Sequence, residues 1–381
     1  MSSQGSMNTS QSSEESDLVK VRKRALKNLR TKYAPWYERF PGWLEHRLRL
    51  PRVFHIPLGV AVFLLACWGM VPLGAADHYT WYWSVMICVA LAWAYAVWFL
   101  WTMRDLTLRL APEIVETLTS EEQIDAIERC WALIYVSRGQ MLVTIVGSII
   151  EIVLLFVSGV IPLLFFGIYP ATTALIMGFM GGAAIWVVST SLYLLRTFAR
   201  FDHIRFNWLA PAKSVSVMCM ASYYVRQATL FVIGSIQWDI IFVLGRVEGL
   251  NRLTWPFIGA FSIIAGITLI YNPLLFILPK STLETMVKRL KNQVRGKIEK
   301  QIAEIYDKKM ASGEPWSESL EPYQELLTQI DESPNSPVDL GGVLRFLGPQ
   351  IGSMLTLFAT GIEYRTWLTS IVEWVRAEML R

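Results

Sequence analysis

Long apolar blocks constrain this chain more than any other feature of its sequence. Six of them occupy roughly residues 53–75, 80–102, 140–168, 172–195, 214–244 and 255–278. A helix needs about 20 apolar residues to cross the ~30 Å hydrocarbon core of a bilayer. Charged residues make up only 17% of the chain, against about 25% in soluble proteins. We therefore predict an all-α, polytopic integral membrane protein with about six transmembrane helices. A cytoplasmic helical region is expected from the 103–139 linker and the 280–381 segment.

The distribution of basic residues predicts the orientation of these spans. Lys and Arg gather before residue 53, within 103–139, within 196–213 and after residue 279, whereas the short linkers 75–79 and 168–171 contain neither. Loops rich in Lys and Arg stay on the cytoplasmic side of a membrane. We expect a multi-pass protein of the inner or plasma membrane, with both termini in the cytoplasm.

Two different segments precede the first span. Residues 1–19 are polar and rich in Ser, which predicts a disordered tail. Residues 20–52 hold eleven Lys or Arg, interleaved with aromatic residues such as Trp36 and Trp43. Basic and aromatic side chains together suit the lipid headgroup layer. Because this segment lies directly before a span, we expect it to contact anionic lipid headgroups in preference to nucleic acid.

The linker at 103–139 has its own helical pattern inside the predicted 53–278 transmembrane domain. Ser120 is followed three residues later by Gln123, the spacing of a helix capping box. Apolar residues then recur at helical spacing, at Ile124, Ile127, Trp131 and Ile134. These features predict an amphipathic cytoplasmic helix that leads straight into the third span.

The chain changes character after Pro279. Residues 279–330 form a charged segment in which Leu283, Val294 and Ile305 stand eleven residues apart. That period keeps one apolar stripe along a long helix, which could pack on the 103–139 helix or between subunits. The sequence pattern of residues 338–381 predicts amphipathic or membrane-packing helices. Arg345 and Pro349 interrupt the apolar run at 340–362, so the sequence does not decide whether this run is a seventh span.

Two charges interrupt the apolar blocks. Glu151 lies thirteen residues beyond Arg138, and Arg226 lies thirteen residues beyond Lys213. At about 1.5 Å per residue, both would lie ~20 Å from the cytoplasmic end of their spans. Charges within a bilayer need a partner, a cavity or the bundle interior. We predict either a structural ion pair or a polar cluster that lines a path for ions or solutes.

The surroundings of Arg226 favour the polar cluster. Its candidate members are Glu151, Arg226, Tyr223, Tyr224, Gln227 and Asp239. A second set of candidates, in the loop between the fourth and fifth spans, comprises Arg200, Asp202, His203 and Arg205. These residues could contact an anion or another ligand, or form an ordinary basic loop. The small residues from Gly178 to Ala184 indicate close helix packing in preference to a pore hinge.

No catalytic, metal-binding or cofactor motif occurs in the chain, so we expect no enzyme activity, no metal and no cofactor. The leading functional hypothesis is an oligomeric channel or pore, most simply a homo-oligomer, gated through its cytoplasmic helices. One alternative is a membrane scaffold or sensor that recruits a soluble cytoplasmic partner. Another is a carrier for a small charged solute.

Overall fold

The computed structural model describes residues 5–38, 47, 51, 54–69, 79–157, 168–249, 255–312 and 317–337. These residues form helices joined by short loops, with one isolated β-bridge between Leu118 and Ile204. The helices are α1 (Gly5–Thr31), α3 (His55–Gly69), α4 (Tyr79–Thr117), α5 (Glu121–Val136), α6 (Arg138–Val157), α7 (Ile168–Ala199), the 3-10 turn η3 (Pro211–Lys213), α8 (Val215–Gly249), α9 (Trp255–Ser312) and α10 (Ser317–Glu332). The predicted all-α class is confirmed.

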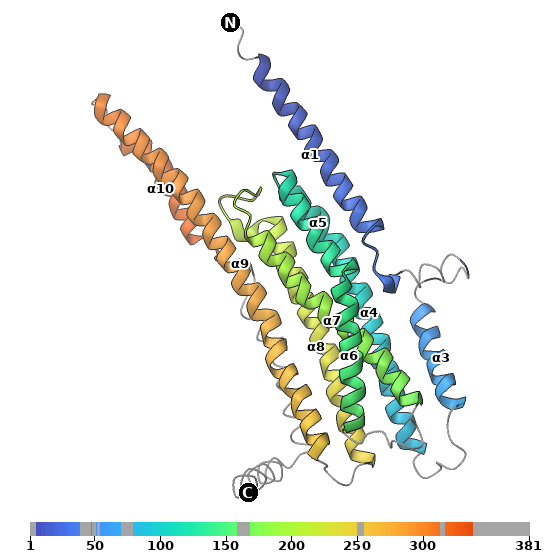
Figure 1. Cartoon of the computed structure of the whole chain (residues 1–381). Helices are drawn as coiled ribbons and strands as arrows, with labels where there is room; N and C mark the ends of the chain where they lie inside the picture. The colour runs from blue at the N-terminus through green and yellow to red at the C-terminus, as the bar shows by residue number, and fades with distance from the viewer. Residues whose placement is uncertain are drawn as a thin grey trace, which may run out of the picture.

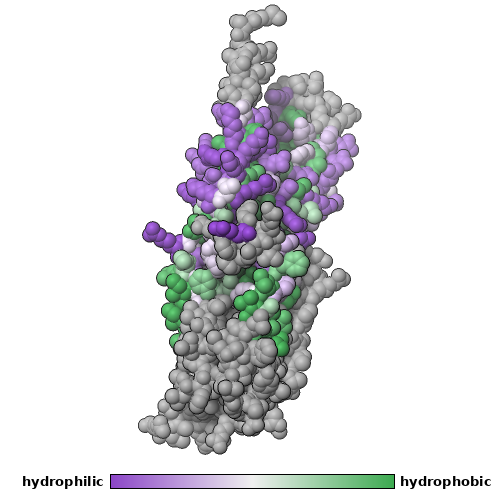
Figure 2. Space-filling view, turned by 90° about the vertical axis from the view of Figure 1, so that its right-hand side faces the viewer, coloured by the Kyte–Doolittle hydropathy of each residue, from purple (hydrophilic) through white to green (hydrophobic). Residues whose placement is uncertain are grey.

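The helices form an elongated bundle with two unlike halves (Figure 1). The polar half holds α1, α5, α10, the C-terminal part of α9 and the loop at 200–213. The apolar half holds α3, α6 and the N-terminal parts of α4 and α9. Figure 2 shows hydrophilic residues over the polar half and a band of hydrophobic residues below it.

Within the polar half, α5 packs as a helix of a water-soluble protein would. The Ser120 side chain accepts a hydrogen bond from the Gln123 amide at 3.3 Å, so the predicted helix start is confirmed. The predicted apolar face is buried as well, and comprises Ile124, Ile127, Trp131 and Ile134. The opposite face exposes Glu121 and Glu122. This half therefore has an apolar core and a charged surface.

The pattern reverses in α6, which follows α5 after the single residue Ser137. The side of α6 that packs inward carries small and polar residues, namely Gln140, Thr144, Gly147 and Ser148. The outward side is aliphatic, with Met141, Leu142, Ile145, Val146, Ile149, Ile150 and Val153 all exposed. In water this arrangement would leave a large apolar surface uncovered. Small residues inside and aliphatic residues outside are typical of helices that pack within lipid.

Glycines bring α6 and α7 close together, as predicted from the small residues of α7. A Cβ atom on Gly182 would lie 2.8 Å from Thr144 Cα, and one on Gly147 would lie 2.9 Å from the Gly178 carbonyl oxygen. Any larger residue at these positions would push the two backbones apart. Gly181 is different, because a Cβ atom there would meet no atom within 4 Å.

Several helices pass from one half to the other without a break, among them α4 and α9. The 39 residues of α4 include 103–117, so the first part of the predicted 103–139 linker continues the preceding helix. The 58 residues of α9 continue through Pro273 and Pro279. Proline removes one hydrogen-bond donor, and buried neighbours of Pro279 such as Leu275 and Leu283 hold the helix on both sides. The helix therefore continues across Pro279, where the composition of the chain changes.

The C-terminal part of α9 forms an antiparallel hairpin with α10. An ion pair joins Arg295 to Asp331 at 3.6 Å, and the Lys291 ammonium donates to the Ser333 carbonyl oxygen. Of the predicted apolar stripe, Leu283 is buried, whereas Val294 and Ile305 are partly exposed. The main partners of α9 are α7, α8, α10 and η3, rather than the predicted 103–139 segment. Residues 338–381, including the possible seventh span at 340–362, lie outside the described residues.

Helix α1 begins at Gly5 and so includes most of residues 1–19, whose expected disorder stays a prediction. Acidic residues precede basic ones along this helix, and Arg30 lies in its last turn, where the helix dipole favours a cation. Lys20 donates to Asp17 at 2.8 Å, and Glu15 lies 3.8 Å from Arg205 of the 200–213 loop. The polar composition suggested disorder, but the basic segment that follows is helical and α1 extends into the acidic one.

Candidate functional site

A buried arginine lies where the two halves meet. Arg104 of α4 is fully buried, and its guanidinium lies over the Tyr135 ring, 4.5 Å from the ring centre. One terminal nitrogen donates to the Leu29 carbonyl oxygen at the end of α1, and Nε lies 3.5 Å from the Glu38 carboxylate. This single side chain therefore joins α4, α5 and the segment after α1. From the sequence, Arg104 was expected to be an ordinary cytoplasmic charge of the 103–139 linker, and this role was not predicted.

The guanidinium is only partly satisfied. Neither Nε nor Nη1 of Arg104 has a hydrogen-bond acceptor among the described residues, so its partners are the Leu29 carbonyl oxygen, the Glu38 carboxylate and the Tyr135 ring. Burial raises the pKa values of Tyr37 and Tyr135 above their ordinary range. Both phenols are therefore neutral at physiological pH. The centre holds one permanent cation and one adjacent carboxylate, Glu38.

A chain of hydroxyl groups continues from Tyr135 across the bundle. The Tyr135 hydroxyl donates to Thr107 Oγ1 at 2.7 Å, and that oxygen lies 3.2 Å from the Tyr223 hydroxyl on α8. The Tyr224 hydroxyl donates to the Ser191 carbonyl oxygen, and the Gln227 amide donates to Ser191 Oγ at 2.7 Å. We call Arg104, Tyr135, Thr107, Tyr223, Tyr224, Ser191 and Gln227 the polar layer.

The polar layer explains why the inner part of the fifth apolar block is polar. Three predicted candidates, Tyr223, Tyr224 and Gln227, are buried and hydrogen-bonded to α4 or α7. A buried polar group is costly unless it is paired, and here neighbouring helices provide the partners. These residues therefore tie helices together, and their polarity does not require a water-filled space.

Arg226 does not belong to this layer. Its side chain is exposed, whereas those of its neighbour Gln227 and of Tyr223 are buried. The prediction that Arg226 is sheltered inside the bundle is therefore wrong for a single chain. The nearby aromatic side chain of Tyr224 shares a small surface hollow with Lys280. Arg226 thus lies close to the level of Lys280, where the basic part of α9 begins.

The predicted equal depth of Glu151 and Arg226 is also wrong. Gln227 contacts Ser191 of α7, so Arg226 lies near the level of that residue. Gly147 of α6 lies against Gly178 and Gly182 instead, and Glu151 follows one helical turn further from the polar half. At about 1.5 Å per residue, the stretch of α7 between Gly178 and Ser191 separates the two levels by ~20 Å. The side chains of Glu151 and Asp239 lie outside the described residues.

The loop candidates between α7 and α8 serve as a structural junction. Thr119 and Gln123 both donate to the His203 carbonyl oxygen at 2.8 Å, which ties the loop to the start of α5. The Arg205 amide donates to the Thr117 carbonyl oxygen at 2.8 Å. From the other side, Arg289 of α9 approaches Asp202 at 3.5 Å. The side chains of Arg200 and His203 are exposed.

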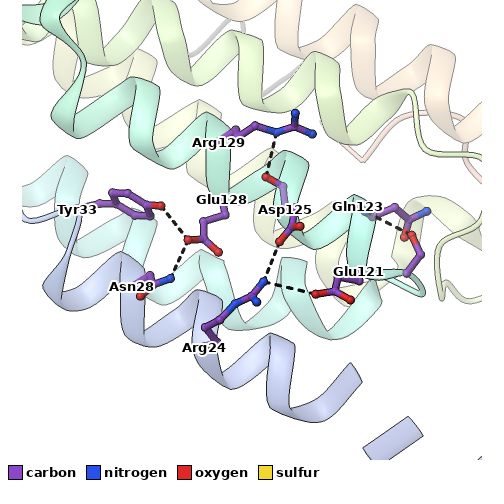
Figure 3. Close-up of polar contacts among 9 residues, drawn as sticks. Arg24, Asn28, Tyr33, Glu121, Gln123, Asp125, Glu128 and Arg129 are labelled. Atoms are coloured by element: carbon purple, nitrogen blue, oxygen red, sulfur yellow. Dashed lines mark hydrogen bonds and ion pairs between the residues drawn. The ribbon is translucent and has the colours of Figure 1, made fainter. Parts of the chain in front are cut away.

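Polar contacts also attach α1 to α5, as Figure 3 shows. Arg24 lies 2.9 Å from Asp125 and 3.7 Å from Glu121. Asn28 and Tyr33 both donate to Glu128 at 2.8 Å. Burial and the Glu128 hydrogen bond raise the pKa of Tyr33 to about 12. Part of the basic segment predicted to contact lipid therefore contacts acidic residues of the protein.

The sequence contained a signal for this attachment. Basic residues recur on α1 at helical spacing, and three acidic residues of α5, Glu121, Asp125 and Glu128, lie three or four residues apart. Arg24 pairs with the first two, and the third accepts hydrogen bonds from neutral side chains. Charge complementarity between two amphipathic helices can be read from such patterns. The sequence does not show which helix lies beside the 20–52 segment. Because the segment directly precedes a span, anionic lipid was the partner that it predicted.

The arrangement suits mechanical coupling more than bond-making chemistry. Its groups are a buried cation, neutral phenols and hydroxyls, all held by contacts with neighbouring helices. Within the described residues, no three His, Cys, Asp or Glu side chains are grouped closely enough to hold a metal ion. Comparison with known protein families, with curated proteins and with solved structures found no match for this chain.

Proposed function

We propose that this chain is a multi-pass protein of a cell membrane that acts as a sensor and scaffold. In this proposal, its spanning helices are coupled to a cytoplasmic platform, the polar half, where soluble partners are recruited. The observation that carries the proposal is the continuity of α4 and α9, which pass through both halves as single helices. A tilt of either helix in the bilayer would therefore move its end in the polar half.

Membrane residence is supported by the reversal of polarity between α5 and α6. Two stretches of the described residues, Glu121–Ile150 and Gly178–Ala199, pass a test of length and composition for crossing a bilayer. The first includes α5, which the proposal keeps in the polar half, so only its α6 part is taken as membrane-spanning. The exposed aliphatic side of α6 begins at Met141, directly after Arg138. Exposed apolar residues also occur on α3, α4, α8 and α9, at Leu58, Leu91, Ile233 and Ile270. We include all six predicted apolar blocks as spans of the proposal.

Collision-based spin-label measurements test the position of the bilayer. Single labels at Ile145 and Ile149, in a background without native cysteines, should encounter dissolved oxygen more often than a water-soluble nickel complex. A label at Glu122, which is exposed on α5, should show the opposite preference. Equal preferences at the three positions would contradict membrane burial of the α6 surface.

Changing bilayer thickness tests the coupling itself. Spin labels at Glu122 of α5 and Lys300 of α9 would report one distance across the polar half, since both side chains are exposed. Thin and thick bilayers change helix tilt through hydrophobic mismatch. We expect the distance to change between nanodiscs of short-chain and long-chain lipids. A flexible glycine insertion after Lys280 interrupts α9 and leaves α4 intact, so it should make that change smaller.

Each outcome of this experiment is decisive. A distance that is the same in thin and thick bilayers would contradict coupling. So would a change of undiminished size when the glycine insertion interrupts α9. The glycine variant also controls for direct effects of lipid on the polar half, because it keeps every residue of that half.

An oligomeric channel gated through the same helices is the second candidate. The observation that favours it is the exposure of Arg226, with Ser222 one turn earlier also exposed on α8. A cation exposed on one chain could line a path between subunits of a homo-oligomer. Purified protein in planar bilayers should then conduct ions, and Arg226→Ala should alter the ion selectivity. An absence of conductance at any voltage, or wild-type selectivity in the variant, would count against the channel.

A further inference from the structure

An open hollow of about 510 Å³ lies in the polar half, between the 200–213 loop and the α9–α10 hairpin. Its volume falls within the range of small-molecule sites, roughly 300–1,000 Å³. We call it the aromatic hollow, because Phe206, Trp208 and Tyr323 line it together with aliphatic residues such as Ile298 and Leu326. Three elements that are distant in sequence therefore build its walls.

Its lining is apolar and aromatic in a part of the molecule whose surface is otherwise charged. Trp208 is 45% exposed there, although tryptophan is usually well covered by other groups. Aromatic side chains of this kind offer flat surfaces to a ring or an alkyl chain. Tyr323 and Gln301 add hydroxyl and amide groups that can form hydrogen bonds with a bound molecule. The apolar part of a ligand would be accommodated by this wall.

The charged residues that line the hollow are of one sign. Arg205 and Lys297 line it, and the described residues of its lining include no Asp or Glu. Arg205 approaches Glu15 at 3.8 Å, but both side chains are more than half exposed, so water weakens this ion pair. Lys297 is exposed on α9. The hollow therefore combines an apolar surface with two cations that can receive an anion.

We propose that the aromatic hollow binds a small amphipathic anion, a molecule with an apolar body and one carboxylate or phosphate group. The anion would lie between Arg205 and Lys297, and the body against Trp208 and Phe206. Aromatic acids and short fatty acids share this chemistry. A soluble metabolite or a lipid-derived acid could each supply it.

A ligand there would connect two parts of the polar half. One wall belongs to the loop that is tied to α5 through the His203 carbonyl oxygen, and the other belongs to the hairpin at the end of α9. Binding would hold α9–α10 against α5. This consequence rests on the proposed coupling function, whereas binding itself can be measured without it.

Equilibrium dialysis of the full chain in nanodiscs tests the binding. The probes are 1-naphthylacetate for an aromatic acid, dodecanoate for a lipid-derived acid, and 1-naphthaleneethanol as an uncharged analogue, with empty nanodiscs as the reference. We expect saturable binding of at least one acid, about tenfold tighter than of the alcohol, which corresponds to ~1.4 kcal/mol. Whichever acid binds more tightly identifies the source of the ligand.

Matched variants locate the site. Trp208→Ala and Lys297→Gln should each weaken binding of the acid about tenfold, and both side chains are exposed enough for the fold to tolerate the change. Lys300→Gln removes a neighbouring exposed cation outside the hollow, and Glu15→Gln removes the partner of Arg205 while keeping the cation. Both control variants should bind within about twofold of wild type.

Three outcomes would overturn the proposal. These are an absence of saturable binding of either acid, equal binding of the alcohol, or unchanged binding in both Trp208→Ala and Lys297→Gln. Circular dichroism checks that the variants are folded, and Trp208→Gln replaces Trp208→Ala if the latter is not. The bilayer-thickness experiment needs no ligand, so failure of binding and failure of coupling are distinguishable.

Discussion

Arg104 of α4 lies over the ring of Tyr135 of α5, with 4.5 Å between the guanidinium carbon and the ring centre. The same guanidinium approaches Glu38 at 3.5 Å and donates to the Leu29 carbonyl oxygen. One side chain thus fixes α1 and the segment after it to the start of the polar half. A buried charge of this kind is stabilising only while its partners stay in place.

Arg104→Met should destabilise the fold by about 3 kcal/mol, because it leaves the Glu38 carboxylate without its cation. Arg104→Lys should give an intermediate loss, since lysine keeps the charge but not the planar fork. Chemical denaturation in detergent micelles measures the free energy, and limited proteolysis reports release of α1. Arg109→Met, an exposed arginine further along α4, is the matched control. Equal losses in both variants would refute the special role of Arg104.

The contact between α6 and α7 gives a prediction with a built-in control. Gly182→Ala places a Cβ atom 2.8 Å from two backbone atoms, Thr144 Cα and the Val143 carbonyl oxygen. The helices must separate, which we expect to cost about 1–3 kcal/mol. Gly181→Ala meets no atom within 4 Å, so alanine's helix propensity should leave stability unchanged or raise it by about 0.5–1 kcal/mol. Thermal unfolding in micelles distinguishes the two, and similar midpoints would contradict close packing at Gly182.

Local features of the fold were predictable because they depend on short sequence patterns. The Ser120 cap and the buried face of α5 follow from spacing alone. The small residues of α7 also indicated their role, because only glycine permits the approach seen between Gly147 and Gly178. In each case the decisive residues lie within a few helical turns of one another.

Long-range features were not predictable in the same way. The depth of Arg226 was counted from Lys213, but the first turns of α8 lie within the polar half, where Tyr223 meets Thr107. Which side of α8 is buried depends on α4 and α7, and the sequence of α8 alone does not specify them. Arg104 resembled a loop charge because its partners, Leu29 and Glu38, are more than 60 residues away in the chain.

The hydrogen bond between Tyr33 and Glu128 predicts a dependence on alkaline pH. The pKa of Tyr33 is about 12 in the folded chain, above its ordinary value of 10.0. Because the folded state holds this proton more tightly, the stabilisation is complete below pH 10 and is lost as pH rises toward 12. Tyr33→Phe should remove this component, so stability should fall less steeply between those values. Thermal unfolding across the range measures it, with Tyr193→Phe, an exposed tyrosine of α7, as control. If stability fell equally steeply with pH in Tyr33→Phe and in the wild type, the raised pKa of Tyr33 would be contradicted.

Arg289 supports the junction between the two walls of the aromatic hollow. It donates to the carbonyl oxygens of Ala199 at 2.6 Å and Phe201 at 2.8 Å, which lie at the end of α7. A cation at a helix C-terminus is also favoured by the helix dipole. Arg289→Met should leave both carbonyl groups unpaired and cost about 1–3 kcal/mol.

The loss of stability in Arg289→Met should appear first in the 200–213 loop. Its reporter is the Arg205 amide, which donates to the Thr117 carbonyl oxygen. Hydrogen exchange of peptides covering Arg205 should become faster in Arg289→Met, because the loop would be held from the α5 side alone. Lys288→Met is the control, since Lys288 pairs with Glu284 on its own helix at 3.2 Å. Faster exchange in both variants, or in neither, would show that Arg289 does not hold the loop to α9.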